Sequence, residues 1–128
     1  MNNQFLSPEV FELVVKNTPL VSIDLIVRQN DKSILLGKRN NPPAKNYWFV
    51  PGGRVFKNET LEEAMHRIFK KELGISLHEA CHIDPQLVGI YQHFYDDSFS
   101  GNEGVSTHYV VIAFSLLVEK QFSSFICD

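Results

Sequence analysis

Apolar residues along the chain form five strand-like runs and two helical stretches. The runs are short, rich in β-branched and aromatic side chains, and separated by Gly, Pro, Asn or Asp, which is typical of β-strands. The predicted strands cover 20–28, 33–38, 47–50, 86–94 and 107–118. The second run is expected to return as the hairpin partner of the first, because the turn-forming residues 29–32 separate the two.

Two segments carry the signals of helix ends. Ser7-Pro8 predicts a helix start, with serine as the N-cap, and that helix is expected to run to about Lys16. The second helix is predicted over Thr60–Leu73, where Thr60 and Glu63 fit a capping box and Gly74 follows as a C-cap glycine. The order of elements predicts one domain over residues 1–128, of the α/β or α+β class, with helices packed on a mixed sheet.

Composition supports a globular chain and removes several classes of function. Of 128 residues, 44% are hydrophobic and 21% are charged, which is ordinary for a protein with a core. The formal charge of −3 gives no electrostatic reason to expect nucleic-acid binding. No apolar run approaches the roughly 18 residues of a membrane span, so no membrane partner is expected. Two widely spaced cysteines are expected to be free thiols in a reducing cytoplasm.

One carboxylate conflicts with the pattern of the second helix. On a helical wheel Glu72 lies about 20° from Leu61, near the middle of the predicted apolar stripe. A buried carboxylate is costly unless it is paired or binds a metal. Just upstream, Gly52-Gly53 is read as a glycine-rich loop that lets backbone approach a ligand closely, although a tight turn is an equally good interpretation. Together these features predict a site at this end of the helix.

The spacing of the charged residues that follow the glycines makes the predicted type of site more specific. Gly53 is followed after five residues by Glu59, after seven more by Arg67, and then by Glu72 and Gly74. This spacing resembles the Nudix box, the signature of the Nudix hydrolase superfamily. Two of its carboxylates are absent, since Ile68 and Lys71 stand where glutamates are usual.

The same losses occur in one Nudix branch, the GDP-mannose mannosyl hydrolases, which this chain resembles over nearly its whole length. The shared stretches lie at 18–22, 36–39, 47–55, 92–97, 99–101 and 107–111. The resemblance implies a Nudix fold, a mixed sheet sandwiched between helices. It also implies hydrolysis of GDP-mannose or GDP-glucose to GDP and free sugar, by attack of water at sugar C1 with inversion.

The resemblance also assigns a metal site. Glu72 matches the metal carboxylate of the branch and the Gly52 carbonyl matches its backbone ligand. Hard oxygen ligands suit Mg²⁺ or Mn²⁺, and the missing carboxylates imply one ion per site. One ion that bridges the diphosphate stabilises it as a leaving group. A second metal, which would activate water for attack at phosphorus, is then not required.

Three arginines match positions that serve the diphosphate or the electrostatics of the site in the branch: Arg39, Arg54 and Arg67. Bidentate arginine suits phosphate well. The competing interpretation for Arg67 is a structural ion pair with Glu59 or Glu63, and for the others a solvated surface charge.

Four more residues match substrate or catalytic positions of the branch: Asp24, His93, Tyr95 and Tyr109. Asp24 is alternatively a strand residue facing water, and the three rings are alternatively packing residues. His78 and His82, four residues apart, are expected to be surface histidines.

The chain departs from the branch after the last predicted strand. In the branch a glutamine that ligates Mg²⁺ and a histidine that acts as general base follow that strand, and a further strand and a helix come later. None of these is found in residues 119–128. Two interpretations stay open: a truncated or frame-shifted product, or a base supplied by another residue, for which His93 is the only candidate.

The branch tends to form homodimers, so a homodimer is expected. The rival functions are an ordinary Nudix pyrophosphatase and an inactive nucleotide-sugar binding remnant.

Overall fold

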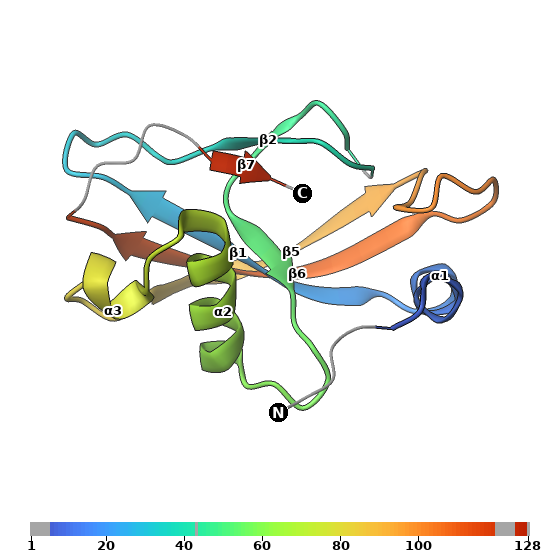
Figure 1. Cartoon of the computed structure of the whole chain (residues 1–128), viewed down its shortest axis with the longest axis horizontal. Helices are drawn as coiled ribbons and strands as arrows, with labels where there is room; N and C mark the ends of the chain where they lie inside the picture. The colour runs from blue at the N-terminus through green and yellow to red at the C-terminus, as the bar shows by residue number, and fades with distance from the viewer. Residues whose placement is uncertain (1–5, 43, 120–124, 128) are drawn as a thin grey trace.

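The computed structural model describes residues 6–42, 44–119 and 125–127. It contains a larger and a smaller sheet with three helices (Figure 1). The order of elements is α1 (Pro8–Asn17), β1 (Leu20–Arg28), β2 (Gly37–Arg39), β3 (Trp48–Phe49), β4 (Gly52–Arg54), α2 (Leu61–Leu73), α3 (Leu77–Ala80), β5 (Gln86–Tyr95), β6 (Thr107–Leu117) and β7 (Phe125–Cys127). In the described part of the chain, no helix is long and apolar enough to cross a membrane.

The larger sheet is mixed, as predicted, with strand order β4-β1-β6-β5. β1 runs parallel to β6 and antiparallel to β4, and β5 runs antiparallel to β6. The ladder between β5 and β6 is regular from Gly89 to Tyr95 and irregular between Leu87 and Gly89. The smaller sheet has the order β3-β2-β7.

The predicted hairpin partner of β1 is only partly correct. The turn forms, since Gln29 N donates to Ser33 O at 2.9 Å, and a single antiparallel bridge joins Arg28 to Ile34. The chain then leaves β1, and its next strand, β2, pairs with β3 and β7 in the other sheet. A short turn starts the hairpin, but long-range pairing decides where the second strand belongs.

The glycine pair is also a correction. Gly52 and Gly53 form a loop in the sequence-based prediction, but they lie in β4, opposite Asp24 and Ile23 of β1. The absence of side chains matters here: a Cβ on Gly52 would lie 2.7 Å from both Asp24 Oδ1 and Ile23 O. Only glycine allows β4 to approach β1 this closely at Asp24.

Two further differences concern the connector and the tail. Residues 76–85, expected to be irregular, contain the one-turn helix α3, which Ser76 caps through its side chain. A strand after 107–118 was expected to be missing, yet β7 forms and runs parallel to β2. Among the described residues no helix follows β6.

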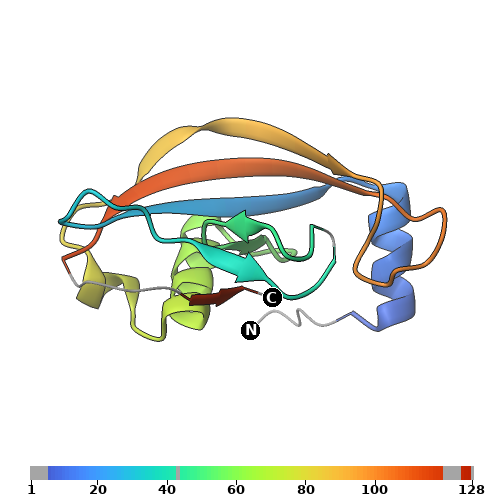
Figure 2. The same cartoon turned by 90° about the horizontal axis from the view of Figure 1, so that it is seen from above.

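The helices cover the larger sheet unevenly. α2 packs on the face that carries Ile23 and Leu25, while α1 contacts Leu20 and Tyr109 at the start of β1 and β6. The sheet therefore lies against helices as predicted, but no helix in the described part covers β5, which forms the outer edge (Figure 2). The core consists of Ile23, Leu25, Val27, Leu35, Ala64, Met65, Ile68, Phe69, Leu77, Ala80, Leu116 and Val118.

Helix α2 begins and ends as predicted. The Thr60 hydroxyl accepts from Glu63 N, the Glu63 carboxylate accepts from Thr60 N, and Gly74 takes a left-handed φ of 80° after the last turn. Its buried stripe is shorter along the helix than predicted. Phe69 is fully buried, whereas Leu61, in the first turn, is 40% exposed. Glu72 has the angular position of the stripe but lies in the last turn, where its side chain is only partly buried.

This stripe is testable by a pair of truncations. Phe69→Ala should lower the free energy of unfolding by about 3 to 5 kcal/mol, because it leaves a cavity in the core. Leu61→Ala, on the same helix but 40% exposed, should cost less than about 1 kcal/mol. Denaturant unfolding followed by circular dichroism measures both, and equal losses would contradict the assignment of the stripe.

Candidate active site

A cleft of about 430 Å³ lies at the β4 edge of the larger sheet, between α1, α2 and the smaller sheet. It gathers residues from segments far apart in the sequence. Every predicted site residue lines it: Asp24, Arg39, Gly52, Arg54, Arg67, Glu72, His93, Tyr95 and Tyr109. The sequence-based predictions therefore converge on one place, although the chemical role of each residue remains a prediction.

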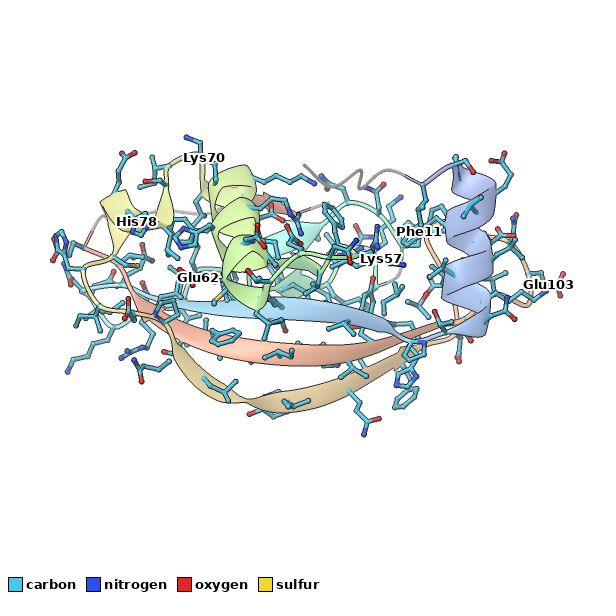
Figure 3. The ribbon with its side chains drawn as sticks, turned by 90° about the horizontal axis from the view of Figure 1, so that it is seen from below. Phe11, Lys57, Glu62, Lys70, His78 and Glu103 are labelled. Atoms are coloured by element: carbon cyan, nitrogen blue, oxygen red, sulfur yellow. The ribbon has the colours of Figure 1, made fainter. Side chains whose placement is uncertain are left out.

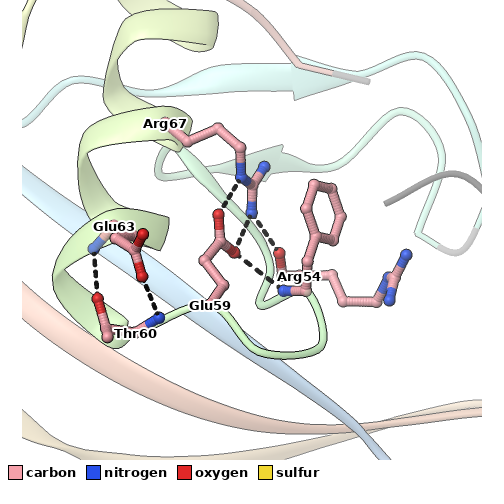
Figure 4. A network of polar contacts seen from close by, with 6 residues as sticks. Arg54, Glu59, Thr60, Glu63 and Arg67 are labelled. Carbon is pink, nitrogen blue, oxygen red and sulfur yellow. Dashed lines mark hydrogen bonds and ion pairs between the residues drawn. The ribbon is translucent and has the colours of Figure 1, made fainter. Parts of the chain in front are cut away.

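Arg67 is held by an ion pair, as the competing interpretation proposed. Its Nε donates to Glu59 Oε2 at 2.7 Å, and a terminal nitrogen donates to Glu59 Oε1 at 3.0 Å and to Arg54 O at 2.8 Å (Figure 4). Glu59 in turn accepts from Phe56 N at 3.0 Å. The hydrogen bonds from Arg67 hold the pKa of Glu59 below its ordinary value. Glu63, the other candidate partner, caps α2 instead.

Arg54 lies between two phenylalanine rings. Its guanidinium carbon is 4.8 Å from the centroid of Phe11 and 4.9 Å from that of Phe56, while Arg67 lies 3.7 Å above Phe56. These are cation–π distances. Burial, and next the charge of Arg67, lower the pKa of Arg54. The rings hold the guanidinium at the cleft, where an anionic ligand would relieve the repulsion between the two arginines.

Phe11 and Phe56 are site residues that the sequence reasoning missed. Phe11 comes from α1, far from the glycine motif, and points from α1 toward the interior of the molecule (Figure 3). It also packs against Phe99, with ring centroids 4.8 Å apart. In the sequence, only the position of Phe11 on the inward side of a predicted helix could have indicated a role in the site. Every core phenylalanine shares that property.

Asp24 is a half-buried carboxylate in the cleft, not a strand residue facing water. Burial raises its pKa from 3.8 to about 6, and the nearby His93 opposes that shift. The carboxylate lies against the backbone of Gly52, in the space that a side chain there would fill. Both protonation states of Asp24 are therefore accessible near neutral pH.

Three rings also line the cleft, and the charge of Arg39 acts on both tyrosines among them. His93 and Tyr95 stack with centroids 6.3 Å apart, and Tyr95 meets Tyr109 edge to face at 6.2 Å. Burial raises the pKa of both tyrosines, so both are phenols that can donate a hydrogen bond. They pack together and line the cleft, so the packing interpretation is confirmed and a substrate or catalytic role stays a prediction.

His78 and His82 are on the surface, as predicted. His82 lies 3.2 Å from Glu119, and the His78 ring lies 4.7 Å from that of His66. Cys81 is a free thiol; the side chain of Cys127 lies outside the described residues.

The donor set of the cleft suits a hard cation that keeps other ligands. Glu72 and Asp24 line it together with Gly52. The described residues contain no group of three or more His, Cys, Asp or Glu that could enclose a metal ion. Mg²⁺ typically binds through one or two carboxylates plus waters and substrate phosphates, so this set fits an ion shared with a diphosphate.

Comparison with known proteins identifies the family of the chain. The NUDIX domain family model matches residues 18–124. The chain belongs to the Nudix family. It is similar to the low-salt glycan biosynthesis protein Agl8 of Haloferax volcanii, 46% identical over 110 residues that make up 85% of this chain and 65% of that protein. It is also 46% identical over 57 residues to an ADP-ribose pyrophosphatase of Methanocaldococcus jannaschii, covering 44% of this chain and 33% of the relative.

Solved structures show the same Nudix fold. The MutT NUDIX hydrolase of Burkholderia pseudomallei superimposes with a TM-score of 0.60 at 27% identity, covering 85% of this chain and 73% of that one. The chain spans less than two thirds of the length of the two curated relatives named above. The match confirms the predicted Nudix fold and leaves the GDP-mannose branch as a proposal.

The raised pKa of Asp24 makes a prediction about stability. A carboxyl whose pKa is higher in the folded state than in the unfolded state destabilises the fold once it ionises, so stability should fall as pH rises from about 4 through 6. Asp24→Asn cannot ionise. It should match the unsubstituted chain near pH 4 and be more stable by about 2 to 3 kcal/mol at pH 7.

Urea unfolding at both pH values, with a chelator present, measures this difference. The exposed Asp84 provides the control, since Asp84→Asn should shift stability equally at the two pH values. A pH-independent difference for Asp24→Asn would show that the carboxyl is not held in a desolvated position.

Proposed function

We propose that this chain is a Mg²⁺-dependent hydrolase of GDP-mannose or GDP-glucose, which releases GDP and free sugar by attack of water at sugar C1 with inversion. The observation that carries the proposal is that Ile68 and Lys71 line the cleft where the Nudix box usually has carboxylates. A site with Glu72 and Asp24 as its carboxylates is suited to stabilise a diphosphate leaving group and poorly suited to gather several metals for attack at phosphorus.

The residues of the cleft supply groups that suit both parts of such a substrate. Arg39 and Arg54, with Lys71 nearby, supply positive charge for a diphosphate. Arg39 packs against Phe49, with its guanidinium carbon 5.9 Å from the ring centroid, and donates to Asn41 O at 3.3 Å, which restricts its position. Asp24, Tyr95 and Tyr109 present hydrogen-bonding groups that suit sugar hydroxyls.

The reaction requires a leaving group to be stabilised and a water to lose a proton. The oxygen of water forms a bond to C1, the bond from C1 to the diphosphate oxygen breaks, and its electron pair stays on GDP. When bound at Glu72 and the Gly52 carbonyl, Mg²⁺ would neutralise charge on that diphosphate. Arg39 and Arg54 add fixed positive charge on the same side.

His93 is the candidate for the base that takes the proton from water. It lies in the cleft on β5, beside Tyr95, and close enough to Asp24 for their charges to interact.

The remaining expectations belong to this proposal. The name of the Agl8 relative refers to glycan biosynthesis, which supports a nucleotide-sugar substrate. A cytoplasmic location, where such sugars and reduced cysteines occur together, and a homodimer are part of the proposal as well.

Product analysis in ¹⁸O-labelled water tests the reaction. Incubation with GDP-mannose and Mg²⁺ should give GDP and mannose, with the label in the sugar and the β-anomer formed first, as seen by mass spectrometry and NMR. GMP with mannose phosphate would indicate an ordinary Nudix pyrophosphatase. Label in GDP would indicate attack at phosphorus, and Mg²⁺-dependent binding without turnover would indicate an inactive binding protein.

Glu72→Gln tests the metal site. It should remove the Mg²⁺ dependence of GDP binding measured by calorimetry, because a neutral amide is a far weaker ligand for Mg²⁺ than a carboxylate. The melting temperature should change little. Glu62→Gln, on the same helix with an exposed side chain, should leave Mg²⁺-dependent binding unchanged. Unfolding of Glu72→Gln would mean instead that Glu72 is structural.

A further inference from the structure

Strand β5 leaves a long, uncharged edge of the larger sheet uncovered. It has ten residues, and its inner edge pairs with β6. Within the described ranges no strand pairs with its outer edge. Natural edge strands are usually protected by charges, prolines or bulges. Residues 86–95 include no charged residue and no proline, and the irregularity at 87–89 lies near one end.

The edge also exposes large apolar side chains. Leu87 is 63% exposed, Ile90 is 66% exposed and Phe94 is 69% exposed. Phe94 stacks on His108 at 4.3 Å on one side and is otherwise open. Because His93 and Tyr95 line the cleft, the alternation of the strand places Ile90, Gln92 and Phe94 on the opposite face.

The strand is complementary to a second copy of itself. The regular part of the ladder, residues 89–95, is centred on Gln92. A two-fold axis through Gln92 and perpendicular to the sheet pairs each residue with one on the same face, so Phe94 meets Ile90 and His93 meets Tyr91 of the other copy. Aromatic and β-branched residues make favourable cross-strand pairs. Residues 86–95 contain no Asp, Glu, Lys or Arg, so they offer no ion pair to a partner of opposite charge.

We propose that β5 pairs antiparallel with β5 of a second copy, centred on Gln92, so that the two larger sheets join into one. The occupant of this edge is a second copy of this chain. The pairing itself depends only on the fold.

The pairing has a consequence for the cleft, and this part rests on the proposed function. Tyr91 shares the cleft face of β5 with His93. In the pair, Tyr91 of the second copy lies across from His93 and closes the side of the cleft assigned to the sugar. Monomeric chain should then bind GDP as the dimer does but turn over GDP-sugar more slowly.

Sedimentation from about one to a few hundred micromolar tests the pairing through mass action. The unsubstituted chain should sediment at twice its 14.7 kDa at the upper end. Ile90→Lys should weaken the dimer at least tenfold, with circular dichroism and the melting temperature of the monomer, at about one micromolar, unchanged, because the side chain is exposed in the monomer. Ile83→Lys, at 62% exposure and outside β5, is the matched control and should leave the dimer intact. A chain that is monomeric throughout, or a dimer that both substitutions spare, overturns the proposal.

Disulfide trapping tests the register. Directly opposed residues in an antiparallel pair have Cα atoms about 4.5 to 5.5 Å apart, which a disulfide can span. Gln92→Cys should therefore form a covalent dimer on mild oxidation, whereas the unsubstituted chain and Val88→Cys, at the irregularity, should not. Cross-linking of Val88→Cys but not Gln92→Cys would refute this register. Both experiments measure assembly and not catalysis. They therefore test the β5 pairing even if the chain does not hydrolyse GDP-sugars.

Discussion

The ion pair between Arg67 and Glu59 is the interaction on which the cleft depends. Arg67 comes from α2 and Glu59 from the segment between β4 and α2, and the same guanidinium also donates to the carbonyl of Arg54. One side chain therefore ties the helix to the strand that carries the glycine pair. The Arg67 side chain is 31% exposed and that of Glu59 only 9%, so the pair is partly shielded from water and from screening by salt. Removing either partner would leave the other poorly compensated in the wall of the cleft.

That ion pair also organises the charges that face a ligand. Arg67 covers one ring, Phe56, and that ring with Phe11 encloses Arg54. Two positive charges are thus held close together by aromatic faces and one carboxylate. The repulsion between the two guanidinium groups lies where a bound anion would relieve it. Favourable interactions elsewhere in the fold offset this local cost, as is common at binding sites. Arg67 thus holds the backbone of Arg54 and packs on the ring beside it, while a catalytic role for Arg67 stays a prediction.

A second constraint is the close approach of β4 to β1. Gly52 faces Asp24 with no room for a side chain between them, so the carboxylate of β1 lies at the floor of the cleft in a desolvated position. The glycine motif thus has a structural and a chemical effect in one place. It lets the strands pair closely, and it holds an acidic group with a raised pKa beside the backbone carbonyl proposed as a metal ligand.

The sequence by itself determined α1, α2 and most of the strands, because caps and periodicity are local signals. The spacing from Gly53 to Glu72 and the family resemblance identified many residues of the cleft, though not Phe11 and Phe56. It could not determine which sheet β2 joins, since that depends on pairing with β3 and β7. Nor could it show that Glu72 lies at the partly buried end of the α2 stripe or that Phe11 reaches Arg54 from α1. These facts depend on how far α2 covers the sheet and where α1 packs. Only tertiary structure decides them, because packing brings together residues whose separation along the chain carries no signal of their contact.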